Sequence, residues 1–435
     1  MKSFLKKIIV KIIELEAKAV LKKYNPKIVA IIGSVGKTGT KDAVYTVLSK
    51  KFFVRKSEKS FNSDIGIPLT ILGCPNGWYS ISTWAKNIFE GLKLIFLTNH
   101  YPKWLVLEVG ADRPGDIEKV ASWVHPDVVV VTRFGDVPVH VEFFDSPEAL
   151  IEEKKHLVKA LKKDGLLILN YDDPRVMEMG KGISAKIITY GFGDGAKIQA
   201  SNEKIFYKTK KGRHIPDGVS FKVNYVGSTV PVRIKGSFGK HQIYGALAGL
   251  SMGVAEDINM ITVVEALGGY ESPPGRLKLI EGINNSLILD DSYNSSPIAL
   301  EGALEALSMI DIKEGGRKIV CLGDMLELGQ FSSDEHKRLG GLVASVANEL
   351  VAVGVRAKGF ADGAHKNKMH KKHIHEYNDS SSASEFLKSF VAEGDLVLVK
   401  GSQSMRMEKI VEILMAEPEN KGELLVRQED VWKNI

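Results

Sequence analysis

Short apolar runs alternate with longer helical segments through the first part of the chain. Near-continuous apolar runs of about five to seven residues are typical of strands that are buried on both faces of a parallel sheet. Helical stretches such as 41–50 and 146–162 separate the runs, so the pattern predicts a βα alternation. The four runs are KIVAIIG (27–33), WLVLEVG (104–110), DVVVVT (127–132) and GLLILN (165–170).

The pattern changes over residues 204–235, where polar and apolar positions alternate around Gly and Asp and predict antiparallel hairpins appended to the sheet. Pro273-Pro274-Gly275 then ends a helical stretch, as expected of a joint between domains. We therefore expect two α/β units, residues 27–272 and 273–435, each with its own core. The runs of the second unit are SLILDDS, KIVCLGD, ELVAVGV and LVLVKGS.

Residues 1–26 form a segment of their own, with one amphipathic helix over 3–23 that ends at Asn25-Pro26. Its apolar face could pack on the neighbouring domain, which is the interpretation we favour, or contact an anionic membrane surface or a partner protein. The apolar face comprises Leu5, Ile8, Ile9, Ile12, Ile13 and Val20, and the lysines outside it are Lys6, Lys7, Lys11 and Lys18.

The composition of the 435-residue chain is that of a globular protein, with 44% hydrophobic and 26% charged residues. A formal net charge of +6 is mild for this length and gives no case for nucleic-acid binding. The two cysteines, Cys74 and Cys321, cannot form a disulfide framework, and no apolar run reaches the roughly 18 residues that span a bilayer. We expect a cytoplasmic monomer without a secretory signal.

The sharpest motif lies where the first apolar run gives way to a helix and reads Gly33-Ser34-Val35-Gly36-Lys37-Thr38. Glycines let backbone N–H groups curl around phosphates, the helix N-terminus attracts negative charge, and a lysine reaches the terminal phosphates. Ile31 stands where the longer form of this P-loop has a glycine, so the match is to the shorter G-x-x-G-K-T pattern. The motif predicts a nucleotide site in which Thr38 holds Mg²⁺.

Three further residues have chemistry that suits such a site, although each has an ordinary structural explanation when it is taken alone. Glu108 closes an apolar run and could organise the metal. His140 lies in VPVHVEFF, and Lys154 lies on a charged helical stretch. The alternatives are that Glu108 is a solvated residue at a strand end, that His140 is a structural histidine, and that Lys154 belongs to a solvent-exposed helix face.

Taken in order, blocks of sequence in both predicted units resemble the Mur ligase family. The blocks in the first unit are GSVGKTGTK (33–41), FNSDIGIPLTIL (61–72), LEVGADRPGDIE (107–118), VHVEFF (139–144), SPEALIEEKKHLVKAL (146–161) and NYDDP (170–174). Those in the second are PPGRLKLIEG (273–282), DDSYNSSP (290–297), LGDMLELG (322–329) and VKGSQSMRMEKIVEIL (399–414). The resemblance spans residues 27 to about 415 and is strongest to the branch that adds D-Ala-D-Ala to UDP-N-acetylmuramoyl-tripeptide in peptidoglycan synthesis.

The resemblance implies an α/β fold made of a P-loop ATPase domain with a parallel sheet and a carboxy-terminal Rossmann-like domain. It implies an ADP-forming ligase that uses ATP and Mg²⁺ to convert a carboxylate to an acyl phosphate, which an amine attacks. Lys37 then acts on the phosphates, the metal ligands are Thr38, Glu108, His140 and Lys154, and Lys154 matches a lysine that the family carbamylates. The other implied nucleotide contacts are Gly33, Ser34, Val35, Gly36, Gly39, Gln242, Arg276 and Asn294, and the implied substrate contacts are Asp291, Lys400, Ser402 and Arg406.

The chain departs from the family pattern at several positions. Gly39 replaces a hydroxyl residue, Gln242 replaces an Asn, and only 32 residues precede Gly33. We therefore expect no separate UDP-binding domain there and weak recognition of the UDP end. Two alternatives stay open: a Mur-like ligase with a different carboxylate acceptor, and a non-catalytic Mur-like scaffold. A P-loop motor or GTPase is disfavoured, because the second α/β unit would have no role in it.

Overall fold

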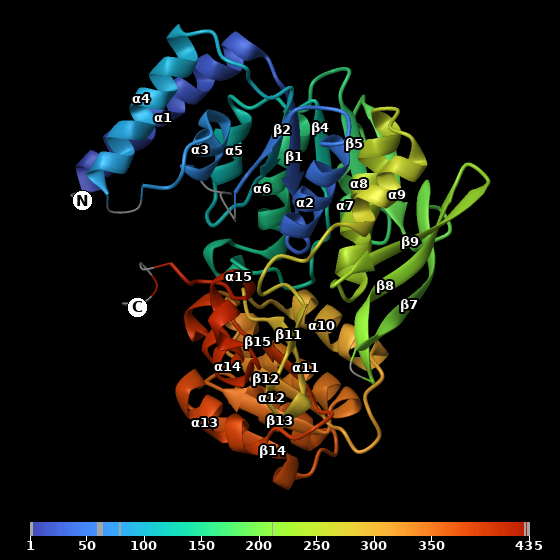
Figure 1. The fold of residues 1–435 in the computed structure, drawn as a ribbon. Coiled ribbons are helices and arrows are strands. Elements are labelled where there is room, and N and C mark those ends of the chain that lie inside the picture. The colour runs from blue at the N-terminus through green and yellow to red at the C-terminus, as the bar shows by residue number, and fades with distance from the viewer. Residues whose placement is uncertain (1–2, 59–63, 78–79, 211, 430–431, 433–435) are drawn as a thin grey trace.

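The computed structural model describes residues 3–58, 64–77, 80–210, 212–429 and 432, and the side chains of residues 3–6 lie outside that set. The chain forms two α/β units, each built on its own sheet, with one above the other in the view of Figure 1. The prediction of two largely parallel sheets in an α/β fold is confirmed.

The first sheet has nine strands in the order β2-β3-β1-β4-β5-β6-β7-β8-β9. Neighbours from β2 to β7 pair in parallel, and the last two pairings are antiparallel. Their bounds are β1 (Lys27–Ile32), β2 (Val54–Lys56), β3 (Trp104–Glu108), β4 (Val128–Val131), β5 (Leu166–Asn170), β6 (Lys186–Gly191), β7 (Ile198–Lys210), β8 (Arg213–Tyr225) and β9 (Ser228–Lys235).

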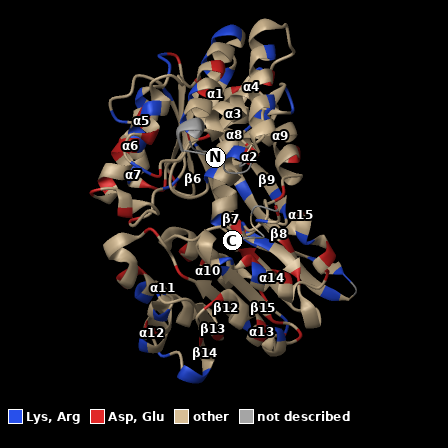
Figure 2. Cartoon of the chain, turned by 90° about the vertical axis from the view of Figure 1, so that its left-hand side faces the viewer, with Lys and Arg blue, Asp and Glu red and all other residues tan. Residues whose placement is uncertain are grey.

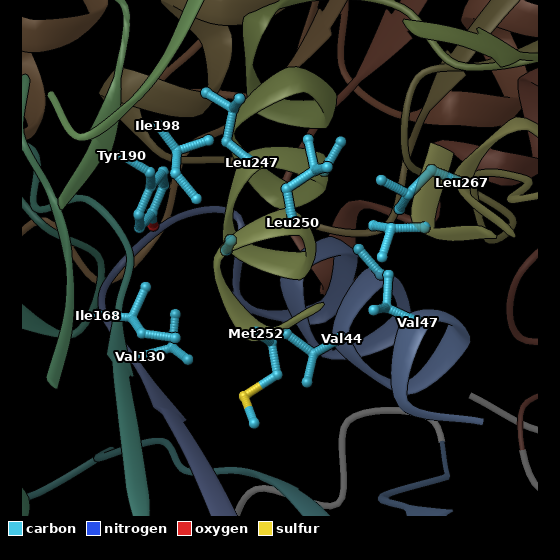
Figure 3. Packing of buried hydrophobic residues seen from close by; sticks show 14 of the residues in the cluster. Val44, Val47, Val130, Ile168, Tyr190, Ile198, Leu247, Leu250, Met252 and Leu267 are labelled. Carbon is cyan, nitrogen blue, oxygen red and sulfur yellow. The ribbon is translucent and has the colours of Figure 1, made fainter. Parts of the chain in front are cut away.

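Helices cover both faces of this sheet, because successive strand residues point to opposite sides and both sets are apolar. One core packs the sheet against α2 (Lys37–Leu48), α8 (Lys240–Ala255) and α9 (Met260–Gly268), as Figure 3 shows for residues such as Val44, Val130 and Leu247. The opposite face carries α1 (Ser3–Tyr24), α3 (Gly66–Leu72), α5 (Asp116–Ala121), α6 (Pro147–Lys159) and α7 (Pro174–Met179).

The second sheet has six strands in the order β10-β11-β15-β12-β13-β14, and only the β10–β11 pairing is antiparallel. Its strands are β10 (Lys278–Glu281), β11 (Leu287–Asp291), β12 (Lys318–Gly323), β13 (Glu349–Val353), β14 (Ile374–Tyr377) and β15 (Leu396–Lys400). One face packs against α10 (Pro297–Met309), α11 (Ser332–Val346) and α12 (Lys358–Lys366), and the other against α13 (Ser380–Phe390) and α14 (Glu408–Leu414).

Short helices complete the chain, and residues of the first unit join the core of the second. Val137, Val141, Ile215 and Phe238 pack with apolar side chains of the second unit, so the two units share a buried contact. The short elements are α15 (Lys421–Leu424) and the 3₁₀ turns η1 (Val141–Phe143), η2 (Ile283–Asn285), η3 (Gly329–Phe331), η4 (Lys371–His373), η5 (Gln403–Met405) and η6 (Pro418–Asn420).

The predicted amino-terminal helix is present as α1, and its apolar face is only partly as expected. Ile9, Ile13 and Val20 are buried against the first unit, which confirms packing as one use of this helix, whereas Ile8 is 40% exposed. The side chains of Leu5 and Lys6 lie outside the described residues. A helix that was not among the predictions, α4 (Ile81–Phe96), lies alongside α1 (Figure 1).

Candidate active site

The G-x-x-G-K-T motif forms the turn between β1 and α2. Gly33 has a φ of +136°, and a Cβ there would collide with the hydroxyl of Thr132, so this close approach needs glycine. Gly36 has a φ of +82° and occupies the N-cap of α2 without a capping side chain. The helix begins at Lys37, four residues before the predicted start, because this left-handed glycine lets it open directly out of the turn.

The side chain of Lys37 folds back over the turn. Its Nζ donates to the carbonyl oxygens of Gly33 (3.0 Å) and Ser34 (3.3 Å), and burial is the main cause that lowers its pKa. The Ser34 hydroxyl is buried and has no hydrogen-bond partner among the described residues. An anion in this turn would give the Ser34 hydroxyl a partner and the Lys37 ammonium an opposite charge.

Glu108 stands beside the P-loop because β3 pairs with β1 in a register that sets it opposite Ile31. The Thr38 hydroxyl donates to its Oε1 at 3.2 Å, and only 2% of the glutamate is exposed. Its Oε2 accepts no hydrogen bond from the described residues, and Lys41 Nζ is 3.8 Å away. Lys41 was missed from the sequence, although its position one turn after Lys37 on the same helix could have indicated it.

The segment after the double proline reaches back to the P-loop. Arg276 donates from Nη2 to the Thr38 hydroxyl at 3.3 Å, and its guanidinium lies 4.0 Å from the ring centroid of Tyr293. Gln242, on α8, donates to the Arg276 carbonyl at 3.3 Å and lies next to Gly39. The structure thus brings the Arg276 side chain to the P-loop. Gln242 binds the backbone of Arg276 and so stabilises the segment that follows Pro273-Pro274-Gly275.

Lys154 occupies a core-facing position of α6, in the stripe that also buries Leu150 and Leu157. Only 3% of it is exposed, and burial, followed by the nearby Lys37 ammonium, lowers its pKa to about 7. In the described part of the chain, no carboxylate forms an ion pair with it. An amine in this position is therefore largely neutral near physiological pH.

His140 lies in the loop after β4 with a φ of +71°. Its Nδ1 is 2.7 Å from Glu327 Oε2 of the second unit, and its Nε2 is 3.6 Å from Asp112 Oδ1. The Asp112 carboxylate also acts on the pKa values of Lys37 and Lys154. Neither Asp112 nor Glu327 was identified from the sequence, although both lie inside the blocks that carry the resemblance.

The predicted residues of the second unit divide into two groups. At the ends of β11 and β15, Lys400 Nζ forms a buried ion pair with Asp291 (2.6 Å) and donates to the Asn294 carbonyl (2.9 Å). Ser402 accepts from the backbone N–H of Leu326 at 2.8 Å. These contacts hold the 290–295 loop and the 324–328 loop together on the side that faces the first unit.

Arg406 lies beyond this cluster in a left-handed conformation with a φ of +53°. Its Nε donates to Glu408 at 2.6 Å, and its Nη1 donates to the carbonyl of Trp432 at 2.9 Å. The carboxy-terminal segment therefore folds back over Arg406, a contact that no sequence pattern indicated.

The donor set around the P-loop fits a hydrated magnesium ion bridged to phosphates. The described residues contain no group of three or more His, Cys, Asp or Glu in metal-binding geometry. Magnesium at nucleotide sites takes one or two protein oxygens and completes its shell with water and phosphate oxygens. The Thr38 hydroxyl and the buried, unsatisfied Glu108 Oε2 provide ligands of that kind.

Family models match most of the chain. The Mur ligase middle domain matches residues 31–253, and the Mur ligase glutamate ligase domain matches residues 275–403. The chain belongs to the Mur ligase family. Its class is therefore that of an ATP-dependent, ADP-forming ligase, which confirms the resemblance found in the sequence.

Relatives and solved structures point to one branch of the family. The UDP-N-acetylmuramoyl-tripeptide–D-alanyl-D-alanine ligase of Bacillus subtilis is 29% identical over 404 residues, covering 92% of this chain and 79% of the relative. The Escherichia coli ligase of the same name is 26% identical, with 89% and 76% covered. The MurF ligase of Thermotoga maritima, solved with ADP, has a TM-score of 0.75 at 25% identity and covers 95% of this chain and 84% of its own.

Proposed function

We propose that this Mur ligase joins D-Ala-D-Ala to the terminal carboxylate of a UDP-N-acetylmuramoyl-tripeptide, a cytoplasmic step of peptidoglycan synthesis and cell-wall biogenesis. The observation that supports it most is the meeting of Glu108 and Arg276, from two segments far away in the sequence, at the Thr38 hydroxyl of the turn whose carbonyls hold Lys37. Matches to ligases of this name in both units support the choice of substrates.

The P-loop residues would act on ATP by holding and neutralising its phosphates. Lys37 exchanges its two backbone acceptors for phosphate oxygens, and Arg276 supplies a second cation from the joint. The acceptor carboxylate then attacks the γ-phosphorus, forming a P–O bond while the bond to ADP breaks. Fixed cations stabilise the charge that develops in this transfer.

Magnesium would be held by Thr38 and Glu108, with Lys41 beside the same carboxylate. We assign a second metal position to His140 and to Lys154 as its carbamate, as the family resemblance implies. The metal supplies charge neutralisation of the phosphates. Glu327 of the second unit lies 2.7 Å from His140 Nδ1, where its carboxylate would orient the imidazole and leave Nε2 to bind the metal.

The amine enters from the second unit. Its nitrogen attacks the acyl carbon, the C–N bond forms, phosphate leaves and the amine loses a proton. We assign Asp291, Lys400, Ser402 and Arg406 to this side because the first three organise the loops that face the ATPase unit. Catalysis then consists mainly of positioning two substrates held by different units.

The test is product formation with ADP and phosphate release, measured with the muramoyl-tripeptide, ATP, Mg²⁺ and D-Ala-D-Ala together and with each omitted. We expect a product heavier than the acceptor by one dipeptide less water, and no product with L-Ala-L-Ala. Product formed only from another carboxylate, such as a polyglutamate-type chain, would assign the enzyme to a different acceptor. No ATP turnover with any acceptor would instead identify a scaffold.

A further inference from the structure

Helix α4 presents an apolar stripe to solvent. Ile81, Ala85, Phe89, Leu92 and Phe96 follow one another at spacings of four, four, three and four residues, which places them on one face of the helix. All five are exposed, Phe89 to 58% and Phe96 to 77%. A surface helix normally turns such a stripe inward, so this face is built to contact something outside the chain.

The opposite face of α4 is well anchored, so the stripe is a fixed feature of the fold. Trp84 and Gly91 are buried, and Gly91 packs directly against Glu16 of α1. Lys23 of α1 donates to the carbonyl oxygens of Leu94 (2.9 Å), Ile95 (3.0 Å) and Leu97 (2.6 Å) at the carboxyl end of α4. The helix has no partner for its outer face among the described residues.

Exposed apolar side chains concentrate on this helix pair. The described residues include 16 large apolar side chains that are prominently exposed, and seven of them lie on α1, on α4 or directly after α4. These seven are Ile8, Leu15, Ile81, Phe89, Leu92, Phe96 and Leu97. The remaining nine are scattered over the surface, as is normal for a globular protein.

The same two helices hold almost all of the net positive charge. Their sequences contain eight lysines and three glutamates, a formal charge of +5, against +6 for the whole chain. Lys86 and Lys93 flank the apolar stripe on α4, and Lys7, Lys11 and Lys22 are exposed on α1. Figure 2 shows the two helices side by side at one end of the molecule with their lysines.

We propose that α1 and α4 together form a docking surface for an anionic lipid bilayer, with the α4 stripe inserted at the level of the headgroups and the lysines facing lipid phosphates. Aromatic and aliphatic side chains on one face, with lysines along its border, are the composition of helices that lie in a membrane interface. No described helix is long and apolar enough to cross a membrane, so the contact is peripheral.

The charge distribution favours lipid over the other occupants of such a surface. A second copy of the chain would bring two patches of +5 together, and their repulsion opposes a symmetric dimer. An anionic bilayer instead attracts every exposed lysine, by about 1 kcal/mol each near the surface. The membrane contact that the sequence left open as an alternative for residues 3–23 is thereby extended to α4, whose exposed apolar stripe is continuous.

The test is sedimentation of the full-length protein with vesicles of phosphatidylcholine alone and of phosphatidylcholine with about one-third phosphatidylglycerol. We expect binding to the anionic vesicles only, weakened at high salt. The double substitution Phe89→Gln and Phe96→Gln should reduce partitioning about tenfold or more, because it removes two exposed aromatic side chains that would enter the bilayer. The control, Ile261→Gln with Val355→Gln, removes two side chains of similar exposure elsewhere and should bind as the parent does.

A second arm tests the charges. Replacing Lys11, Lys22 and Lys86 with Gln should reduce binding to anionic vesicles, whereas replacing Lys366, Lys368 and Lys371, a separate exposed basic group, should not. Thermal unfolding of each variant checks that the fold is kept. The proposal is overturned by absent vesicle binding, by binding that is unchanged in the α4 variant, or by a solution dimer that the same variant dissociates.

Discussion

Replacing Lys154 with alanine should raise the Mg²⁺ requirement of the ligase and lower its turnover. Lys154 is buried on α6 among apolar side chains, and burial with the Lys37 ammonium lowers its pKa to about 7. A carbamate forms when a neutral amine attacks CO₂, makes an N–C bond and releases a proton. The product is an anion, and an anion is what a cation site needs.

The protonation state of Lys154 sets the fraction of the amine that can react with CO₂. At about pH 7.5 an amine with a pKa near 7 is about three-quarters neutral, whereas an ordinary lysine is neutral in about one molecule in a thousand. Burial therefore raises the reactive fraction by nearly three orders of magnitude. Loss of one charged group that positions the metal should cost about 10²- to 10³-fold in turnover.

The assay is product formation against Mg²⁺ concentration, in CO₂-depleted buffer and with added bicarbonate. Bicarbonate should stimulate the parent enzyme and leave Lys154→Ala unaffected, and a short carboxylic acid should restore part of the activity of the variant. The matched control is Lys155→Ala, which removes a neighbouring lysine that pairs with Glu152 at 3.3 Å. An alanine variant with the parent's activity and Mg²⁺ dependence would refute the role of Lys154.

Three further predictions concern other parts of the chain. Lys37→Ala should abolish ligation without changing the melting temperature, because it loses about 3–4 kcal/mol of transition-state binding. ATP turnover equal to the parent's would refute the assignment of Lys37 to the phosphate site. Burial raises the pKa of Glu16 to about 7 from 4.5, so its proton stabilises the fold at low pH and this contribution is lost as pH rises towards 7. The Glu16→Gln variant should therefore be more stable than the parent by about 1 kcal/mol near pH 8 and equally stable near pH 4.5. Thermal melts of both proteins across this pH range measure the difference, and a difference that does not change with pH would contradict the prediction. Arg427→Ala should destabilise the second unit by about 2 kcal/mol, because the buried Arg427 guanidinium donates a hydrogen bond to the Glu408 carboxylate at 2.7 Å, and a denaturant midpoint equal to the parent's would exclude this contribution.

The sequence predicted the strands and the nucleotide turn well because their signals are local. Short apolar runs such as 104–110, set between helical segments, are typical of strands with two buried faces, and the G-x-x-G-K-T pattern sets its own turn. Glu108 could be predicted beside Thr38, since a residue closing a neighbouring parallel strand reaches the same sheet edge. The family followed from the order of blocks across both units.

Contacts between distant segments could not be predicted in the same way. The pairing of His140 with Glu327 depends on how the two units meet, and the approach of Arg276 to Thr38 depends on the path of the joint. The helical spacing of α4 is present in the sequence, but the pattern alone does not tell whether an apolar stripe faces the core or solvent, so the exposure of this stripe could not be predicted.

The central claim, activation of a carboxylate by ATP, is tested most directly with an acceptor that carries oxygen-18 in both oxygens of its terminal carboxylate. Attack on the γ-phosphorus places one labelled oxygen between carbon and phosphorus, and attack by the amine then breaks the C–O bond. Mass spectrometry should find one labelled oxygen in each released phosphate and the other in the new amide. Unlabelled phosphate released alongside ADP, or label recovered in AMP, would contradict an acyl phosphate and with it the proposed reaction.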